Sequence, residues 1–235
     1  MLIHGLGRSA RAMRPLAQQL VEAGYRVHNL DYPSTSSAPE ALVEHVHAAL
    51  ARCCAAAERV HFVTHSLGGI VLRAYLADRD LPALARVVML APPNRGSEYV
   101  DVAGDWALFE HLLGPTATQL GTGPESLPNR LPPPEFELGV IAGTGGLRWI
   151  GDTVIEGEND GTVSVASTRI EGMRDFIELD VSHTFIMRNP EVAAQVIHFL
   201  RSGCFEHEAS PERAPRFAGD AQLVTSRTSC PPGAY

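Results

Sequence analysis

The sequence of 235 residues lacks the features that mark several large classes of protein. Its 19 lysine and arginine residues are scattered, and 27 acidic residues outnumber them, which gives a formal net charge of −8. A chain without a basic cluster presents no surface suited to the phosphate backbone of a nucleic acid. We therefore expect no nucleic-acid partner.

Long apolar runs are also missing. No stretch approaches the roughly 20 consecutive apolar residues that a membrane-spanning helix requires, so we expect no integral membrane segment. The first residues do not show the basic, apolar and small-residue zones of a signal peptide. As written, the sequence predicts a cytoplasmic protein, and a secreted one only if the true N-terminus lies upstream.

Cysteine is scarce, and the spacing of the four cysteines matches no metal site. Cys53 and Cys54 are adjacent in an alanine-rich helical pattern, and Cys204 and Cys230 flank the C-terminal region. We expect unpaired thiols, with a Cys204–Cys230 disulfide as the alternative for an exported protein. No phosphate-binding glycine loop is present. The sequence therefore predicts no metal and no other cofactor.

What is present is enough apolar material, 45% of the residues, for one domain with its own core. Short β-rich runs alternate with longer amphipathic ones, which predicts an α/β fold whose parallel sheet carries helices on both faces. The expected strands cover residues 2–4, 25–30, 59–64, 86–90, 138–142 and 176–180. The expected helices cover about 13–23, 67–78 and 190–200, and a further helix, with Ser37 as a possible cap and Pro39 near its start, carries apolar residues at helical spacing from Leu42 to Cys53.

Two regions do not follow this alternation. Residues 91–137 are rich in glycine and proline, with one plausible short helix around Trp106 to Leu113. A segment this long without a strand indicates a lid or a pocket-forming excursion. Residues 203–235 are rich in proline, serine and charge, which predicts a loosely ordered tail beyond a domain of residues 1–202.

Ser66 lies where an apolar strand is followed by a turn and a helix, in Thr64-His65-Ser66-Leu67-Gly68-Gly69. Such a turn pushes the serine Oγ out of the sheet and places the next backbone N–H at a helix N-terminus, where an oxyanion is stabilised. The pattern departs from G-x-S-x-G because Thr64 replaces the first glycine, so we expect a more crowded turn. The alternative is an ordinary serine that caps a helix.

His4-Gly5-Leu6-Gly7 after the first strand, together with this serine segment, resembles the α/β-hydrolase superfamily, and within it the small esterases and lipases. Ala91-Pro92-Pro93-Asn94-Arg95-Gly96-Ser97 is similar to the segment that lipases often carry after the fourth strand. The resemblance covers about residues 1–202 and implies a three-layer α/β-hydrolase fold with about six mostly parallel strands. It also implies that the chain begins on the third strand of the full fold, and a misplaced start codon would look the same.

The resemblance implies a base in the loop between the last strand and the last helix, and His183 lies there. His198 falls inside the last helix and His207 in the tail, so both are poorly placed. The acid should follow the strand at 138–142, where the candidates are Asp152, Glu156, Glu158 and Asp160. We choose Asp160, because Glu158-Asn159-Asp160-Gly161 resembles the acid-bearing turn of these lipases and an Asn-Asp-Gly turn can aim a short carboxylate. Asp152 is the runner-up, and a simple turn residue is the alternative role for Asp160.

By the same resemblance, the backbone amides of Leu6 and Leu67 form the oxyanion hole, whereas His4 and His65 are expected to be structural. Tyr99, Trp106 and Phe109 lie in the excursion, where they would line a substrate pocket or belong to the core.

The sequence therefore predicts a serine hydrolase that cleaves a small-molecule or lipid ester through an acyl-enzyme on Ser66. Two alternatives stay open. One is a thioesterase, amidase or acyltransferase on the same triad, and the other is a non-catalytic binding module of this fold. The sequence does not predict the oligomeric state.

Overall fold

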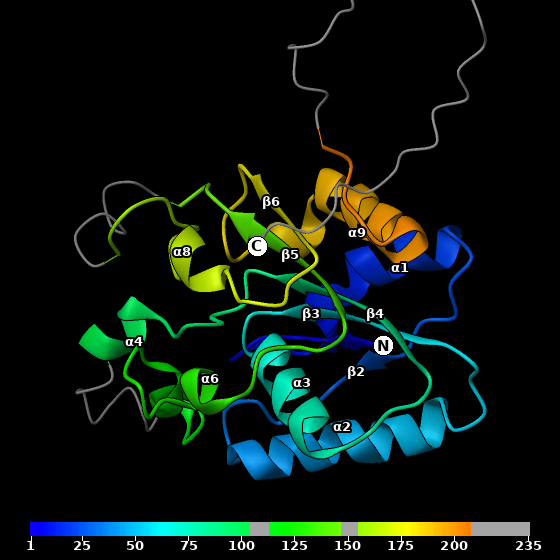
Figure 1. Ribbon diagram of the computed structural model, residues 1–235, viewed down its shortest axis with the longest axis horizontal. Helices are drawn as coiled ribbons and strands as arrows, with labels where there is room; N and C mark the ends of the chain where they lie inside the picture. Colours follow the sequence, from blue (N-terminus) through cyan, green and yellow to red (C-terminus); the bar gives the residue numbers. More distant parts are fainter. Residues whose placement is uncertain (104–112, 147–154, 208–235) are drawn as a thin grey trace, which may run out of the picture.

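The computed structural model describes residues 1–103, 113–146 and 155–207. At its centre is a six-stranded sheet in the order β2-β1-β3-β4-β5-β6 (Figure 1), and every neighbouring pair of strands is parallel. The strands are β1 (Leu2–Ile3), β2 (Asn29–Leu30), β3 (Val60–His65), β4 (Leu84–Leu90), β5 (Glu137–Gly143) and β6 (Asp175–Leu179). The predicted fold class is confirmed.

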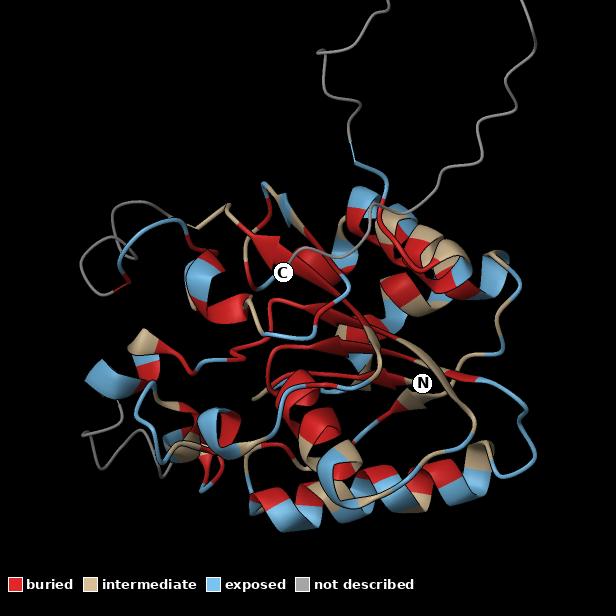
Figure 2. Ribbon diagram, in the orientation of Figure 1, coloured by how far each residue is buried: buried red, intermediate tan, exposed pale blue. Residues whose placement is uncertain are grey.

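Helices cover both faces of this sheet. α1 (Arg14–Glu22) and α9 (Pro190–Ser202) lie on one face, and α2 (Pro39–Cys53) and α3 (Leu67–Asp78) lie on the other (Figure 1). The central strands are buried on both sides, as Figure 2 shows. In β4, Val87 and Met89 join the apolar cluster on one face, while Val88 and Leu90 join the cluster on the other. This alternation follows from the two-residue period of a strand, and it explains why β4 reads as a continuous apolar run.

The last helix illustrates how local sequence sets the element bounds. The Asn189 side chain at the N-cap of α9 accepts hydrogen bonds from the N–H groups of Glu191 and Val192, at 2.7 and 3.2 Å. Pro190 occupies the first turn, where no N–H is needed. The helix ends at Gly203, whose φ of 84° suits a residue without a Cβ.

The prediction for the second strand was wrong in its length. Of the expected residues 25–30, only Asn29 and Leu30 pair, because the neighbouring β1 provides only Leu2 and Ile3 in register with them. Tyr25 and Val27 still pack against an apolar cluster of the core. Their apolar character therefore reflects burial and not membership of a strand.

The described part of the excursion contains three short helices: α4 (Glu98–Ala103), η2 (Ala117–Leu120) and α6 (Leu127–Arg130). Most of the expected helix around Trp106 lies outside the described residues. Arg73 of α3 fastens both ends of the excursion, because its guanidinium donates to the carbonyls of Asn94, Leu131 and Pro132 at 3.2–3.3 Å. Burial lowers the pKa of Arg73 to about 10. A further short helix, α8 (Val165–Thr168), follows the acid-bearing turn.

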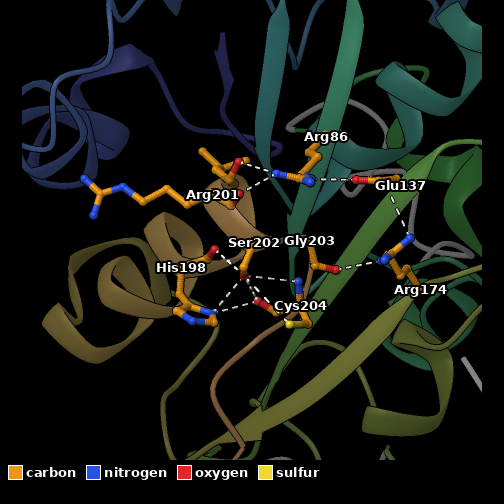
Figure 3. A network of polar contacts seen from close by, with 9 residues as sticks. Arg86, Glu137, Arg174, His198, Arg201, Ser202, Gly203 and Cys204 are labelled. Carbon is orange, nitrogen blue, oxygen red and sulfur yellow. Dashed lines mark hydrogen bonds and ion pairs between the residues drawn. The ribbon is translucent and has the colours of Figure 1, made fainter. Parts of the chain in front are cut away.

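Ordered structure extends past the expected domain end at residue 202. The Arg86 side chain donates to the carbonyls of Leu200 and Arg201 and pairs with Glu137, and Arg174 donates to the carbonyl of Gly203 (Figure 3). Phe205 is only 3% exposed and donates its N–H to Asp175 at 2.7 Å. Residues 203–205 are therefore held against the domain, and the loose order of the tail stays a prediction for residues 208–235, which lie outside the described part.

The expectation of unpaired thiols was wrong for the adjacent cysteines, since Cys53 and Cys54 form a disulfide. Cys53 is the last residue of α2, and Cys54 leaves helical geometry with a φ of −132°. Within a helix, consecutive side chains point in directions about 100° apart, so the pair forms only where the helix ends. Cys230, the partner considered for Cys204, lies outside the described residues. None of the helices in the described ranges has both the length and the apolar character needed to cross a bilayer.

Two buried histidines and one half-buried histidine are expected to make the fold sensitive to acid. Burial lowers the pKa of His4, His61 and His65, and for His61 the value falls to about 4. Arg59 and Arg86 also disfavour the charged form of His61. In the unfolded chain each imidazole has a pKa near 6.5. Between these values the unfolded state binds more protons, so stability is present above about pH 6.5 and falls as the pH drops toward the folded-state pKa.

We accordingly expect the melting temperature to fall between pH 7 and pH 5, and His61→Phe to weaken this dependence because it removes one titrating group. The measurement is thermal unfolding at several pH values. His45→Phe, at an exposed position of α2, is the control and should leave the slope unchanged. An identical slope for His61→Phe and the wild type would contradict the assignment.

Gly68, in the first turn of α3, packs against the backbone at the end of β1. A Cβ at this position would lie 2.5 Å from the carbonyl oxygen of Ile3 and 2.7 Å from that of His4. We expect Gly68→Ala to destabilise the fold by about 3 kcal/mol through overpacking, which lowers the melting temperature by roughly 6–12 °C for a domain of this size. Gly123→Ala is the control, because no atom lies within 4 Å of a Cβ there, and it should shift the melting temperature by less than about 2 °C. Equal melting temperatures for Gly68→Ala and Gly123→Ala would show that β1 can move away from α3 at little cost.

Candidate active site

Ser66 occupies a strained position between β3 and α3. Its φ of 52° and ψ of −125° place a residue with a side chain in a region that favours glycine, at a cost of about 1–3 kcal/mol. Although Ser66 stands at the N-cap of α3, its side chain makes no capping hydrogen bond. The alternative of an ordinary capping serine therefore does not describe this residue, and the hydroxyl is left available for chemistry.

Thr64, two residues before the serine, has room for its side chain because Gly69 on α3 has none. Its Oγ1 is buried and would lie 3.2 Å from a Cβ on Gly69. This hydroxyl has no hydrogen-bond partner among the described residues. The Thr64 side chain, which replaces the first glycine of the motif, is thus packed tightly against α3, and a side chain larger than that of Gly69 would crowd it.

The loop after β1 lies directly against this turn. A Cβ on Gly5 would lie 3.0 Å from the Cβ of Ser66, so only glycine permits the approach. His4 fixes the loop: its Nδ1 donates to the carbonyl of Gly5 at 2.9 Å, and the N–H of Tyr32 donates to its Nε2 at 3.4 Å. Within the described part of the chain, the N–H groups of Leu6 and Leu67 have no acceptor. Both amides are thus free for the predicted oxyanion role, which stays a prediction.

His183 and Asp160 form a buried pair. The Nδ1 of His183 lies 2.7 Å from Oδ2 of Asp160, and the backbone N–H of His183 donates to the carbonyl of Asp160 at 2.9 Å. Because a carboxylate only accepts, the hydrogen of the neutral ring lies on Nδ1, and Nε2 keeps a lone pair that can take a proton. This is the tautomer that a general base needs.

The Asn159-Asp160-Gly161 turn aims the carboxylate. Oδ1 of Asp160 accepts from the N–H groups of Thr162 and Val163, at 3.0 and 2.8 Å, so the side chain cannot rotate away from the histidine. Gly143, at the end of β5, gives it room, since a Cβ there would lie 2.8 Å from the Cβ of Asp160. These two bonds and the contact of Oδ2 with His183 leave neither carboxylate oxygen unpaired, although Asp160 is only 2% exposed.

The loop that carries His183 contacts the residue next to the serine. The Nε2 of His65 lies 3.1 Å from the carbonyl oxygen of His183, and the two rings lie 4.8 Å apart, centre to centre. The fold thus brings residues from the first and last thirds of the chain together. Sequence reasoning missed this contact, and its only signal was the position of His65 beside Ser66.

The remaining candidates lie elsewhere. Tyr99, on α4, is 47% exposed, and Trp106, Phe109 and Asp152 lie outside the described residues. Glu156 and Glu158 are exposed. His198 contacts the carbonyl of Cys204, and His207 contacts Asp175, so both histidines have partners away from Ser66. In the described ranges, no three His, Cys, Asp or Glu side chains are grouped so that they could hold a metal ion.

Comparison with known proteins relates most of this chain to one family. The sequence pattern of the alpha/beta hydrolase family matches residues 1–196. None of the curated proteins matches the chain in sequence.

Solved structures share the fold at low sequence identity. The mature lipase BlEst2 of Bacillus licheniformis is 22% identical, with a TM-score of 0.68 over 85% of this chain and 90% of that protein. Its propeptide form is 21% identical, with a TM-score of 0.69 over 91% of this chain but 51% of that protein. The metagenomic carboxyl esterase MGS0156 is 19% identical, with a TM-score of 0.60 over 79% of this chain and 64% of that protein. This chain thus spans about half the length of the propeptide form of BlEst2 and about two thirds of the length of MGS0156.

The pairing of Asp160 with His183 can be tested by removing the negative charge. We expect Asp160→Asn to slow the reaction of Ser66 with a fluorophosphonate by roughly 10³-fold, because an amide can stabilise the wrong tautomer of His183 and not its cation. The rate is followed by mass spectrometry of the labelled protein. Asp180→Asn is the matched control, since Asp180 is exposed and lies three residues before His183, and it should react at nearly the wild-type rate. Similar losses in both variants would indicate a general charge effect.

Proposed function

Because the chain belongs to the alpha/beta hydrolase family, we propose that it is a serine hydrolase that cleaves carboxylic esters, with Ser66, His183 and Asp160 as its triad. The observation that carries this proposal is the buried Asp160–His183 pair, 2.7 Å apart, in a loop held against the residue beside a strained serine. The lipase and esterase folds of the solved structures support the same class of substrate.

In the first half of the proposed reaction, Nε2 of His183 takes the proton of the Ser66 hydroxyl as Oγ bonds to the ester carbonyl carbon. The carbonyl oxygen becomes negative in the tetrahedral intermediate and accepts from the N–H groups of Leu6 and Leu67. His183 then gives its proton to the alcohol oxygen as the carbon–oxygen bond breaks. The alcohol leaves, and the acyl group stays on Ser66.

In the second half, water replaces the alcohol. His183 takes a proton from the water as its oxygen attacks the acyl carbon, and it returns that proton to Oγ of Ser66 when the acid product leaves. Asp160 stays ionised throughout and stabilises the imidazolium that forms twice per cycle. Its two backbone hydrogen bonds on Oδ1 keep it in place during both steps.

The substrate in this proposal is a small-molecule or lipid ester. In this proposal residues 1–202 form the hydrolase domain and residues 91–137 form its lid or pocket wall, with Tyr99 as an exposed member. The fastening of this excursion to buried Arg73 supports its treatment as part of the same domain. A thioesterase, an amidase or an acyltransferase would use the same triad, so the test includes their substrates.

We expect Ser66→Ala to lower the hydrolysis of p-nitrophenyl esters by roughly 10⁴-fold or more without changing the melting temperature, because it removes only the attacking oxygen. His183→Ala should lose nearly as much. The measurement is initial rate over a series of acyl chain lengths, with acyl-CoA thioesters and anilides in parallel. The fastest substrate class identifies the reaction.

Ser36→Ala is the control, because Ser36 is an exposed serine in the loop before α2, and it should keep wild-type activity. Equal turnover by Ser66→Ala and the wild type would contradict the proposed nucleophile. A wild type that binds these esters without cleaving any of them would favour a binding module.

A further inference from the structure

His65 is buried beside the proposed triad without belonging to it. It is the last residue of β3, is 1% exposed, and lies between the turn that carries Ser66 and the loop that carries His183. Its Nε2 lies 3.1 Å from the carbonyl oxygen of His183. A carbonyl only accepts, so Nε2 must carry a hydrogen and donate it.

When Nε2 carries the hydrogen, the other ring nitrogen of His65 can only accept, and the lack of a donor for it costs free energy. Nδ1 is buried and has no hydrogen-bond partner among the described residues, and it faces Gly5, where a Cβ would lie 2.8 Å away. A buried acceptor without a partner costs about 1–3 kcal/mol. A phenylalanine ring would fill similar space without that cost, so the packing of the core alone does not account for a histidine here.

The charge state of His65 suits a donor beside a base. Burial, together with the nearby His183, holds the pKa of His65 well below its ordinary value. The ring is therefore neutral while His183 takes up a proton, and it does not repel the imidazolium. Arg8 and His4 also lower the pKa of His65, by smaller amounts.

The anchors of His183 come from two elements. Asp160 holds the ring through Nδ1 and the backbone through its N–H, and both bonds tie His183 to the acid turn. Among the described residues, the bond from His65 to the carbonyl is the one hydrogen bond that ties His183 to the turn that carries Ser66. Without it, the His183 loop would still be tied to the chain after β1 by the hydrogen bond from Arg8 to Thr184 at 3.2 Å, but that bond is exposed and does not involve His183 itself.

We propose that His65 is a positioning residue, whose Nε2–H holds the His183 loop at the distance from Ser66 that proton transfer requires. This role rests on the proposed function, because it gives His65 a part in the same reaction. A displacement of about 1 Å in such a contact can cost on the order of 10²-fold in rate.

Substitution of His65 by glutamine and by asparagine, whose amide groups lie at different distances from the backbone, provides the test. A glutamine amide reaches about as far from the backbone as Nε2 of a histidine, and an asparagine amide reaches only as far as Nδ1. We expect His65→Gln to keep kcat within about 3-fold of the wild type. His65→Asn and His65→Phe should lower kcat by roughly 30- to 100-fold with little change in KM, because ester binding does not use this bond.

The measurement is kcat and KM for a p-nitrophenyl ester at several pH values, with melting temperature as the check of folding. The acid limb of the kcat/KM profile should lie at the same pH in His65→Gln and the wild type, since His65 is neutral there. If His65→Phe does not fold, the Gln and Asn variants decide the question by themselves. Wild-type kcat in folded His65→Asn, or equal losses in the Gln and Asn variants, would overturn the positioning role.

The rate at which a fluorophosphonate labels Ser66 separates this inference from the proposed function, since labelling needs only the nucleophile and its base. A wild type that does not react contradicts the proposed nucleophile itself. A wild type that reacts, with His65→Asn reacting equally fast, contradicts only the role of His65. A slow reaction in His65→Asn that returns to the wild-type rate in His65→Gln supports it.

Discussion

The site depends on one buried interaction, the hydrogen bond between the Asp160 carboxylate and the His183 imidazole. Either group alone would be a costly buried polar side chain, and together they satisfy each other. The surrounding backbone is arranged around this pair. Two amides of the turn occupy the second carboxylate oxygen, and Gly143 leaves the space into which the acid fits. The imidazole is thereby fixed in the tautomer that can accept a proton.

The sheet brings the parts of the site to one edge. All strands are parallel, so the residues that follow β1, β3, β5 and β6 meet at the carboxyl ends of the strands, where open α/β sheets place their ligands. Close packing at this edge is possible because glycines stand where two backbones meet, at Gly5 and Gly68. The strained φ of Ser66 is maintained by the same packing, since β3 and α3 are both held in the core on either side of it.

Sequence patterns predicted local features well and contacts between distant segments poorly. The apolar runs of β3, β4 and β5 identify buried parallel strands, and the serine turn identifies itself by the strand and helix that flank it. The strand at 25–30 was too long because apolar residues beside the sheet carry the same pattern as residues within it. The Cys53–Cys54 disulfide was missed because the alanine-rich pattern places both cysteines in a helix, where consecutive side chains point about 100° apart, whereas α2 ends between them. The contact of His65 with His183 joins residues 118 positions apart, and no local pattern reports it.

The sequence alone determined the class of fold, because local periodicity sets the order of strands and helices, and its resemblance to the α/β-hydrolase superfamily implied the chain order of a serine, an acidic turn and a late histidine. It offered four acids for one histidine and no means of measuring their distances. Only the tertiary structure decided that Asp160 contacts His183 and that His65 ties the base loop to the serine turn. The physical reason is that a hydrogen bond depends on tenths of an ångström between side chains, and those distances exist only after the strands have paired and the helices have packed.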